Sequence, residues 1–548
     1  MTQAEAERAQ ALRMEAFAEH LRFPRHRSEM PAGGHTGAAG GAPCGDLIVI
    51  SLSLDRADAD GRVDAAGFEA SGCGAAIAAG SAAVSILEGK SLLQAARIGA
   101  AEISSQLGGL SAGKFHAAEL AADALHRALG LAAGSAALPP AKGRILVAMS
   151  GGVDSAVAAL LSAEQGSETV GVTLELWADA GNDESRSCCS ALAQRTARAL
   201  AHEIGIPHFS IDMRRQFRAG VVARWLEGHA EGMTPNPCVR CNGEVRLDGM
   251  LKLAESLGAE ALVTGHYARL AWEELDNGES GALEASRGGV GFGVGRAVRS
   301  TASCGAFGAA PEVTAEHDAA NPARGGGAPR LPLLMVALDE GKDQSYALAA
   351  LPRSSLARMR FPLGALRKDE VRKIAEQAGL TVARRPDSQD LCFLAGTGKK
   401  AFLRRHGVAG RSGAIIDEQG RRLGEHAGAE LYTVGQRHGL RIGGGQPLYV
   451  LSTDVAANTV TVGARERLLS GEMELCDAVL HCDAAAVDSL KIRYRGSRIR
   501  CTLAGAHRSG PHERLTIRLG ERAERTAAGQ LACLYSGELL VGYGTIMR

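Results

Sequence analysis

The sequence has no net charge and no long apolar run. Lysine plus arginine and aspartate plus glutamate each number 61 among 548 residues, so any nucleic-acid footprint must be local. Nowhere do about 18 apolar residues follow one another, as a membrane span would need. The amino terminus, MTQAEAERAQ, is acidic and amphipathic, unlike the basic and then apolar start of a secretion signal. These absences predict a soluble, cytoplasmic protein with no membrane association.

Cysteine is also scarce. Twelve cysteines in a chain of 548 residues make a thin disulfide framework, and in a reducing compartment they suit catalytic or metal-binding roles better. The chain is longer than one hydrophobic core usually sustains, because cores stop growing at roughly 250–300 residues. Several domains are therefore expected.

The first part of the chain mixes helical and extended patterns. Residues 1–30 look helical, and PAGGHTGAAGGAP (31–43) is typical of a flexible, glycine-rich lead-in. DLIVISLSL predicts a strand, and the alanine-rich stretch AAIAAGSAAVSILEGKSLLQAARIGAAEISSQL predicts helices. GLAAGSAALPPAKG (130–143) has the composition of a linker.

From Arg144 onward, strands and helices alternate. The strands ILVAM, TVGVTLELW and ALVTGHY and the helices DSAVAALLSAEQG and SALAQRTARALAHEIG are typical of βαβ units, which build a parallel sheet. Residues 277–329 are low in large apolar residues and rich in glycine and alanine, which predicts a disordered insertion. After residue 400 the chain changes to short strands with turn signals, so the C-terminal third is expected to be rich in β-structure.

One hinge, RILVAMSGGVDSAVAALL (144–161), sets polar residues between two apolar elements. A strand that ends in SGGVDS before a helix gathers backbone N–H groups and the positive helix end at one point, which suits a phosphate. Glycines let the backbone approach the anion, and the hydroxyls of Ser150 and Ser155 can donate further hydrogen bonds. The Walker pattern G-x-x-x-x-G-K-[ST] is not used here. Two interpretations stay open from these residues alone, an ordinary strand–helix turn and a phosphate loop.

The SGGVDS string resembles the PP-loop of ATP pyrophosphatases, which cleave ATP between its α and β phosphates and adenylate a substrate oxygen. Six further stretches narrow the resemblance: TPNPCVRCN (234–242), TGHYARL (264–270), GKDQSYAL (341–348), DSQDLCFL (387–394), YTVGQRHGL (432–440) and KIRYRG (491–496). In this order they resemble the tRNA-specific 2-thiouridylase (MnmA) family over residues 143–548. The resemblance implies a tRNA-uridine 2-sulfurtransferase that uses ATP with Mg²⁺ and acts on the wobble uridine of tRNA.

A second resemblance covers the amino-terminal part. HLRFPRHRSEM, GAPCGDLI, FEASGCGAAIAAGSAA, EGKSLLQA and KFHAAELAADALHRAL are similar, in order, to the IscU/NifU-type iron–sulfur scaffold. The two resemblances together imply an α+β module at 1–130, a linker at 131–142, an α/β PP-loop domain with a parallel sheet at 143–396, a central tRNA-binding domain at 397–472 and a C-terminal β-barrel at 473–548.

The implied chemistry needs two thiols. A uracil C2 carbonyl is a poor electrophile, so its oxygen must first accept AMP, and sulfur must then arrive as a nucleophile from a cysteine persulfide. By resemblance Cys241 is the nucleophile and Cys392 carries the persulfide, with a transient disulfide that an external reductant reopens. Cys238 stands where some relatives have an aspartate. The C-x-x-C pair with Cys392 is also compatible with an iron–sulfur cluster, and the pair alone with a zinc site or a redox couple.

The resemblance also implies binding residues. The expected ATP contacts are Ala148, Met149, Ser150, Gly151, Gly152, Val153, Asp154 and Ser155, with Leu174 lining the adenine pocket and Gly265 letting the nucleotide pass. The expected tRNA contacts are Asn236, Pro237, Cys238, His266, Lys342, Asp343, Gln344, Arg493, Tyr494 and Gln530. KIRYRGSRIR (491–500) is expected to be a strand with one basic face, for which a solvated edge strand is the alternative.

In the scaffold-like part, the resemblance implies that Cys44, Asp46, Cys73 and His116 are metal ligands. The third cysteine of the scaffold family is replaced by Ala117, so a tetrahedral zinc site suits the remaining ligands better than cluster assembly does. We expect this part to dock a cysteine desulfurase or another sulfur carrier beside the thiolase, tethered by a short linker. A degenerate domain retained for stability is the alternative.

Two rival functions remain from the residues. One is another PP-loop adenylating reaction, such as amidation of a small molecule, against which Cys241, Cys392 and the basic stretch at 491–500 argue. The other is an iron–sulfur scaffold or carrier in which the remainder is only an RNA-binding adaptor. Loss of ATP consumption on substitution of the loop glycines would separate an enzyme from a carrier.

Overall fold

A computed structural model describes residues 15–40, 45–55, 57–177, 191–274, 330–387, 391–394, 396–408, 410–443, 446–494 and 496–547. Of the stretch expected to be helical at 1–30, residues 15–22 are helical and the first 14 lie outside these ranges. The insertion expected at 277–329 also lies outside them.

The amino-terminal module, residues 15–135, is a three-stranded antiparallel sheet covered by helices. Its strands are β1 (His35–Gly40), β2 (Leu47–Leu54) and β3 (Val63–Ser71), in that order. The helices are α2 (Gly74–Ser85), α3 (Leu92–Ala95), α4 (Ala100–Gln106) and α5 (Phe115–Ser135). Small residues let helix and sheet approach closely, since a Cβ on Gly80 would lie 2.3 Å from the Phe68 ring.

Strand β1 corrects the expectation of a flexible lead-in at 31–43. Residues His35–Gly40 pair antiparallel with β2 over their whole length. The glycine content has a structural cause, because α5 crosses this strand and a Cβ on Gly37 would lie 2.2 Å from the carbonyl oxygen of Ala124. The composition that suggests flexibility therefore reflects close contact between a helix and a strand.

The second domain contains a five-stranded parallel sheet in the order β10-β7-β4-β5-β6, which confirms the expected α/β class. Its strands are β4 (Arg144–Ala148), β5 (Glu168–Glu175), β6 (His208–Asp212), β7 (Ala261–Thr264) and β10 (Met359–Arg360). The crossover helices include α6 (Val153–Glu164) and α7 (Ala191–Ile204), and α15 (Lys368–Gln377) lies against α6.

Between β6 and β7 the chain is helical. The α-helices are α8 (Arg214–Phe217), α9 (Arg224–Ala230), α10 (Pro237–Arg240) and α11 (Leu247–Ser256). Two π-helical stretches interrupt them, η1 (Arg218–Ala223) and η2 (Cys241–Arg246). Such wide turns often occur at functional sites. The short helices α13 (Ser345–Leu348) and α14 (Arg353–Leu356) follow strand β9 (Arg330–Met335) in sequence.

The C-terminal third is built of β-structure, as expected. After α16 (Lys399–Arg405), a four-stranded sheet has the order β12 (Arg422–His426), β11 (Gly413–Ile416), β14 (Thr459–Gly463) and β13 (Tyr449–Asp454). The last sheet contains β15 (Leu469–Leu480), β18 (Gly510–Glu524), β17 (Ile499–Leu503), β16 (Ser489–Lys491), β19 (Leu531–Ser536) and β20 (Leu539–Ile546). Pairing of β15 with β20 closes these strands into a barrel.

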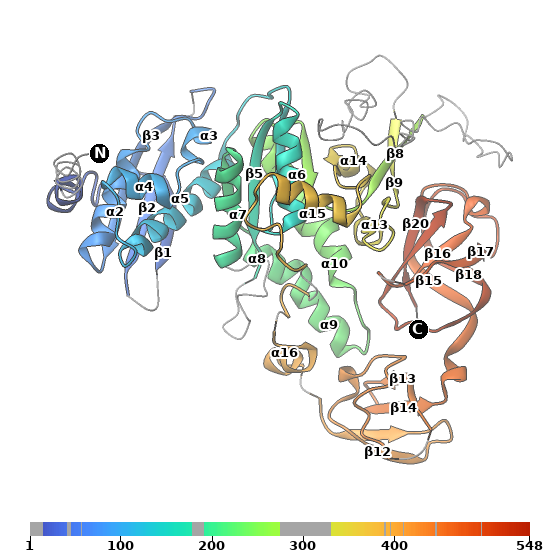
Figure 1. Ribbon diagram of the computed structural model, residues 1–548. Helices are drawn as coiled ribbons and strands as arrows, with labels where there is room; N and C mark the ends of the chain where they lie inside the picture. Colours follow the sequence, from blue (N-terminus) through green and yellow to red (C-terminus); the bar gives the residue numbers. More distant parts are fainter. Residues whose placement is uncertain are drawn as a thin grey trace.

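Strands β8 (Arg269–Glu274) and β9 (Arg330–Met335) extend the barrel sheet through β20. These strands leave the parallel-sheet domain and return to it, so they join that domain to the barrel (Figure 1).

Within 491–500, the described residues 492–494 and 496–498 lie outside any strand, which corrects the expected strand with one basic face. Strand β16 ends at Lys491 and β17 begins at Ile499. The N–H of Gly496 donates to the carbonyl oxygen of Arg493 at 3.0 Å and closes the turn. Lys491 is buried, and its ammonium lies 3.3 Å from the Asp343 carboxylate. The basic residues of this stretch therefore differ in environment: Lys491 is in a buried ion pair, whereas Arg493 is exposed.

Helix α5 corrects the expected linker at 131–142, since it continues to Ser135. The chain that follows is bound to the parallel-sheet domain: the N–H of Leu138 donates to Ser256 and that of Ala141 to Gly258, both at 2.9 Å. A Cβ on Gly130 would lie 2.0 Å from the carbonyl oxygen of Ser210. The module is therefore docked on the second domain, with α5 beside α7 and β6 (Figure 1).

Candidate functional site

The polar hinge forms a loop at the carboxyl end of β4. Gly151 has a φ of +72°, a left-handed conformation that favours glycine. The Ser155 hydroxyl accepts a hydrogen bond from the Ser150 N–H (3.1 Å) and donates one to the Gly152 carbonyl (3.0 Å). No side chain caps the start of α6 at Gly152, so the first N–H groups of this helix are left for a ligand.

The expected nucleotide contacts gather around this loop. Leu174 is buried near the end of β5, which pairs with β4, and Gly265 follows β7, which pairs with β4 on its other side. A Cβ on Gly265 would lie 2.8 Å from backbone atoms of Asp154 and Ser155. Gly265 therefore lets the start of α6 approach the end of β7. The remaining expected contacts are continuous with these: Ala148, Met149, Ser150, Gly151, Gly152 and Val153.

A charge cluster adjoins the loop, which we call the loop charge cluster: Asp154, Lys342, Lys368, Arg372 and Asp387. The Lys368 ammonium lies 2.6 and 2.8 Å from the two Asp154 oxygens and 2.9 Å from Asp387. Lys342 and Arg372 also contact Asp387, at 2.7 and 3.1 Å. Partial burial works to raise the pKa of Asp387, but hydrogen bonds from Lys342 and Lys368 outweigh it and lower that pKa to about 2.

Helix α7 lies between this loop and the amino-terminal module. A Cβ on Gly151 would lie 3.0 Å from the carbonyl oxygen of Ala193 in α7. Two arginines of the same helix reach the module: Arg195 and Arg198 hold the carboxylate of Asp123 in α5, at 2.8 and 2.7 Å. One helix thus touches the candidate phosphate loop and the module.

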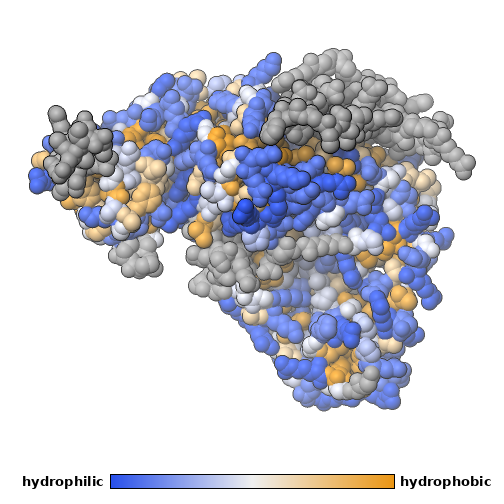
Figure 2. All heavy atoms as spheres, viewed as in Figure 1, coloured by the Kyte–Doolittle hydropathy of each residue, from blue (hydrophilic) through white to orange (hydrophobic). Residues whose placement is uncertain are grey.

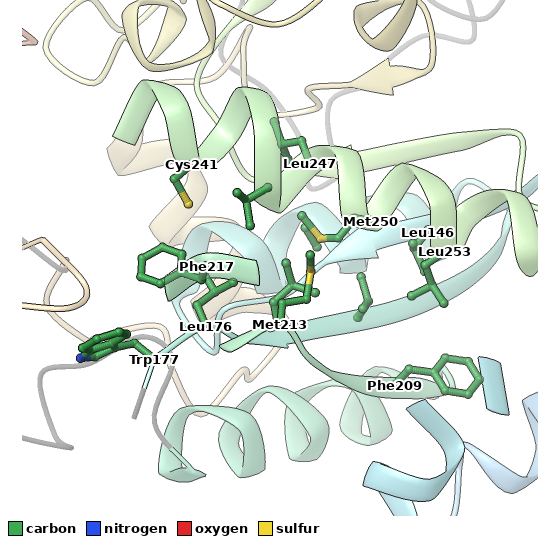
Figure 3. Close-up of a cluster of buried hydrophobic side chains, with 14 of the residues drawn as sticks. Leu146, Leu176, Trp177, Phe209, Met213, Phe217, Cys241, Leu247, Met250 and Leu253 are labelled. Atoms are coloured by element: carbon green, nitrogen blue, oxygen red, sulfur yellow. The ribbon is translucent and has the colours of Figure 1, made fainter. Parts of the chain in front are cut away.

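The C-x-x-C pair lies where α10 meets the π-helical stretch η2. Asn236 caps α10, its side-chain oxygen accepting the N–H of Cys238 at 3.1 Å, and Pro237 occupies the first helical position. Cys238 is exposed, whereas Cys241 is buried. Figure 3 shows the Cys241 sulfur turned toward the ring of Phe217.

Cys392 borders the same core. Its neighbour Phe393 packs edge-on against Phe217, with ring centroids 6.1 Å apart, and against Trp225 at 5.3 Å. Cys392 itself is half-buried against the cluster that contains Cys241. Two segments about 150 residues apart in sequence are thus anchored to one aromatic cluster, which also contains Trp177 and Phe402.

The expected tRNA residues of the 341–348 motif are partly committed to the fold. Gln344 exchanges hydrogen bonds with the backbone of Tyr267, at 2.9 and 2.8 Å. Asp343 is only 4% exposed and accepts from Ser345 and Lys491. The expected contact of Asp343 with tRNA stays a prediction, and in this conformation its side chain is buried among these partners.

The other expected tRNA residues lie nearer the surface. His266 is half-buried and shares a hydrogen bond of 2.9 Å with Thr264, and burial together with Arg246 lowers its pKa to about 3. Arg493 and Tyr494 are exposed on the turn between β16 and β17. The Gln530 amide donates to the carbonyl of Thr234, four residues before Cys238. The barrel and the cysteine motif are therefore in contact.

In the module, three expected metal ligands converge. Ligand atoms of Asp46, Cys73 and His116 all lie within 4.8 Å of one another. The Cys73 thiol is 3.1 Å from one Asp46 oxygen, and His116 Nε2 is 3.5 Å from the same oxygen. A Cβ on Gly72 would lie 2.0 Å from Asp46, so the turn before α2 requires glycine. Cys44 lies outside the described residues.

One sulfur, one oxygen and one nitrogen ligand fit a tetrahedral zinc ion that takes a fourth ligand from elsewhere. Ala117, at the position of the missing third cysteine, is fully buried. Within the described ranges Cys238, Cys241 and Cys392 do not form a second such group. The geometry thus favours metal binding in the module and thiol chemistry at the second domain.

Sequence reasoning missed Lys368 and Arg372, and it quoted Asp387 without giving it a role. No local signal marks these residues, because Lys368 is one charge among several on a polar helix and its partner Asp154 is 214 residues away. Only the arrangement of α15 against α6 shows that they share a site with the loop.

Comparison with known proteins covers most of the chain. Family models match in order: a NifU-like N terminal domain at 13–133, a tRNA methyl transferase HUP domain at 143–286 and 317–396, a tRNA methyl transferase PRC-barrel domain at 400–464, and an aminomethyltransferase beta-barrel domain at 472–546.

Curated relatives agree with these matches. The bifunctional protein NifU/MnmA of Rubrobacter xylanophilus is 38% identical over 544 residues, which cover 97% of each chain. The tRNA-specific 2-thiouridylase MnmA of Roseiflexus castenholzii is 35% identical and covers 74% of this chain and 99% of its own. That of Geobacter metallireducens is also 35% identical and covers 74% and 97%. Among the described residues, no helix has the length and apolar character to cross a membrane.

Proposed function

We propose a function from one premise: this chain belongs to the tRNA-specific 2-thiouridylase family, in the form that carries a NifU-like domain at its amino end. It is a tRNA sulfurtransferase. The proposed reaction is ATP-dependent 2-thiolation of the wobble uridine of tRNA. The observation that carries this proposal is the single aromatic cluster that anchors Cys241 and the segment of Cys392 beside the carboxyl end of the parallel sheet.

The first step would be adenylation. The loop at 148–155 would hold the phosphates of ATP, because Gly151 and the uncapped start of α6 present N–H groups to an anion. Leu174 would line the adenine pocket, and Gly265 would keep the loop close to β7. The C2 oxygen of the uracil would attack the α phosphorus and displace pyrophosphate, which converts that oxygen into a leaving group.

The second step would transfer sulfur. A persulfide on Cys392 would attack C2 and displace AMP. The Cys241 thiolate would then attack the Cys392 sulfur, so that a Cys241–Cys392 disulfide forms and the 2-thio group stays on the base. The terminal sulfur is reduced by two electrons while the two thiols are oxidised by two, and an external thiol reductant would restore them.

The tRNA would approach across the barrel and the cysteine motif. Arg493 and Tyr494 are exposed on the β16–β17 turn, where a cation and an aromatic ring suit phosphate and base contacts. Asn236, Pro237 and Cys238 would line the pocket of the flipped uracil. The further proposed contacts are His266, Lys342, Gln344 and Gln530.

The module would support sulfur delivery. Asp46, Cys73 and His116 would hold a zinc ion, with Cys44 as the fourth ligand, and an iron–sulfur cluster would be cargo rather than a resident group. We propose a cysteine desulfurase or another sulfur carrier as the partner of this surface. A cluster held by Cys238, Cys241 and Cys392 is less favoured, since these residues do not group as metal ligands in the described part of the chain.

Reconstitution of the full chain tests the proposal. With unmodified tRNA, ATP, a cysteine desulfurase and cysteine, nucleoside mass spectrometry should detect 2-thiouridine, and AMP should form with it. Cys241→Ser should abolish thiolation and leave tRNA binding within about threefold of wild type, because the change removes one sulfur atom. Cys476→Ser is a matched control, since this half-buried cysteine lies in the barrel. Thiolation by the Cys241→Ser variant would contradict the proposal.

A further inference from the structure

Lys368 occupies an unusual position beside the candidate phosphate loop. Its side chain is only 12% exposed, yet its ammonium meets carboxylates from two other segments, Asp154 in the first turn of α6 and Asp387 after α15. The same ammonium lies 5.9 Å from the ring centroid of Tyr267, whose hydroxyl donates to Asp154 at 2.8 Å. Three partners therefore fix its position.

Positive charge exceeds negative charge around Lys368. Lys342 and Arg372 contact Asp387, and Arg385 donates to the carbonyl oxygen of Gly151 at 2.9 Å. Asp339 adds a third carboxylate, which accepts the backbone N–H of Lys368 at 3.0 Å. Four cations thus surround three carboxylates, and the uncapped start of α6 adds its N–H groups to the same place. Such a cluster of charges suits a ligand that carries several negative charges and is accompanied by a divalent cation.

We propose that Lys368 is a catalytic residue that binds the β and γ phosphates of ATP and stabilises the departing pyrophosphate. This proposal rests on the proposed function and deepens it. In the adenylation step the uracil oxygen bonds to the α phosphorus, the bond from that phosphorus to the bridging oxygen breaks, and pyrophosphate takes the electron pair. The N3 proton of the base goes to water. The Lys368 ammonium faces the charge that develops on the leaving oxygen.

In the same site, Asp154 and Asp387 become ligands for the Mg²⁺ that accompanies ATP. Without nucleotide their carboxylates take the place of the phosphate oxygens as partners of Lys368, which keeps the ammonium ordered for the reaction. The alternative is a purely structural role, in which Lys368 only ties α15 to α6. If Lys368 has only a structural role, its substitution should lower the free energy of unfolding. If Lys368 binds phosphate, its substitution should slow adenylation.

The neighbouring helix surface supplies a matched control. Helix α15 presents a strongly hydrophilic face to solvent (Figure 2). Lys373, in the same helix and five residues after Lys368, is exposed. Lys373→Met removes the same charge from the same helix without touching the loop. Both variants remove one positive charge from α15, but only Lys368→Met removes it from the loop charge cluster.

The test is tRNA-dependent exchange of labelled inorganic pyrophosphate into ATP by the full chain, which measures adenylation without sulfur transfer. Lys368→Met should slow exchange by about 100-fold or more, as loss of one preorganised donor typically does, with the melting temperature within a few degrees of wild type. Lys368→Arg should recover at least tenfold of that loss, and its inhibition by pyrophosphate should be at least tenfold weaker than in wild type. Lys373→Met should match wild type.

Two results would overturn the assignment. One is exchange by Lys368→Met within threefold of the Lys373→Met control. The other, which decides the matter should Lys368→Met fail to fold, is wild-type exchange and pyrophosphate inhibition in Lys368→Arg. If the wild-type chain thiolates no tRNA and exchanges no pyrophosphate, the proposed function fails first, so the two failures are distinguishable.

Discussion

At the scale of single residues, the sharpest geometry is that of Asp46. Its carboxylate is buried, yet one oxygen accepts the backbone N–H of Cys73 at 2.8 Å and the other meets both the Cys73 thiol and His116. A buried acid held in this way is oriented before any ligand arrives. Its orientation suits a metal ion, because a carboxylate oxygen, a thiol sulfur and an imidazole nitrogen lie within 4.8 Å of one another.

We predict that the full chain binds about one equivalent of Zn²⁺ through this site. Cys73→Ala should weaken zinc binding at least tenfold, because it removes one of the ligands that the metal needs. His26→Ala is the control, since this exposed histidine pairs with glutamates away from the site. Competition with a zinc-binding dye measures the affinity, and equal affinities for the two variants would refute the assignment.

At the scale of elements, the strand–loop–helix unit at 144–164 depends on the contact between Gly151 and α7. A side chain at Gly151 would meet two obstacles, a φ of +72° and the carbonyl oxygen of Ala193 at 3.0 Å. Gly166 has a similar φ of +77° but open space around its would-be Cβ. Substitution of Gly166 introduces backbone strain alone, whereas substitution of Gly151 introduces both backbone strain and crowding at the loop.

Both Gly151→Ala and Gly166→Ala should lower the free energy of unfolding by about 1–2 kcal/mol, because each forces alanine into the left-handed region. Gly151→Ala alone should weaken ATP binding, at least tenfold, because the loop must move away from α7. Isothermal titration with ATP distinguishes the two. Unchanged ATP affinity in Gly151→Ala would show that the loop does not hold the phosphates.

Some elements of this fold can be predicted from the sequence and others cannot. The PP-loop unit was predictable because its apolar periods and its polar hinge are local signals. Strand β1 and the end of α5 were not, because glycine and alanine there serve contacts between distant segments, such as Gly37 with Ala124 and Gly130 with Ser210. The alternating pattern of 491–500 predicts a strand, and only the burial of Lys491 against Asp343 shows that its charges do not share one face. In the site itself, Lys368 was not predictable for the same reason, because its partner Asp154 is 214 residues away in sequence.

At the scale of the whole molecule, the module and the parallel-sheet domain share one buried core and one polar interface. In the interface, His126 donates to the carbonyl of Ile98, and His208 donates to Thr173, whose hydroxyl reaches Met149 beside the loop. Arg198 is paired with Asp123 at 2.7 Å. The module therefore packs against the parallel-sheet domain and is not merely connected to it by a flexible linker.

Removing Asp123 should undock the module. Asp123→Ala leaves the buried Arg198 without its carboxylate, which should cost about 3 kcal/mol or more in the free energy of unfolding. The module should then melt in a separate transition and become sensitive to limited proteolysis near residue 136. Asp64→Ala, an exposed change on β3, is the control. A single transition at the wild-type temperature would contradict docking through this pair.

The interface should also weaken in acid. Burial, together with the positive charge of Arg198, lowers the pKa of both His126 and His208 well below 6.5. Both rings are then neutral in the folded state, so their contribution to stability is present above pH 6.5 and is lost as the pH falls below it. Each should contribute about 1 kcal/mol between pH 6.5 and 5.5, because an unfolded imidazole is half protonated at the start of that range and almost fully protonated at its end. Urea unfolding at pH 7.5 and 5.5 measures this, and the dependence should weaken in His126→Gln.

The proposed reaction depends on two thiols, distant in sequence, that act on one activated base. The most direct measurement is peptide mass spectrometry of the chain after a single turnover with tRNA, ATP and a persulfide donor, without added reductant. A disulfide-linked peptide pair containing Cys241 and Cys392 should appear in proportion to the 2-thiouridine formed, and it should be absent when ATP is omitted. Thiolated tRNA accompanied by two cysteines that both remain open to alkylation would contradict the account.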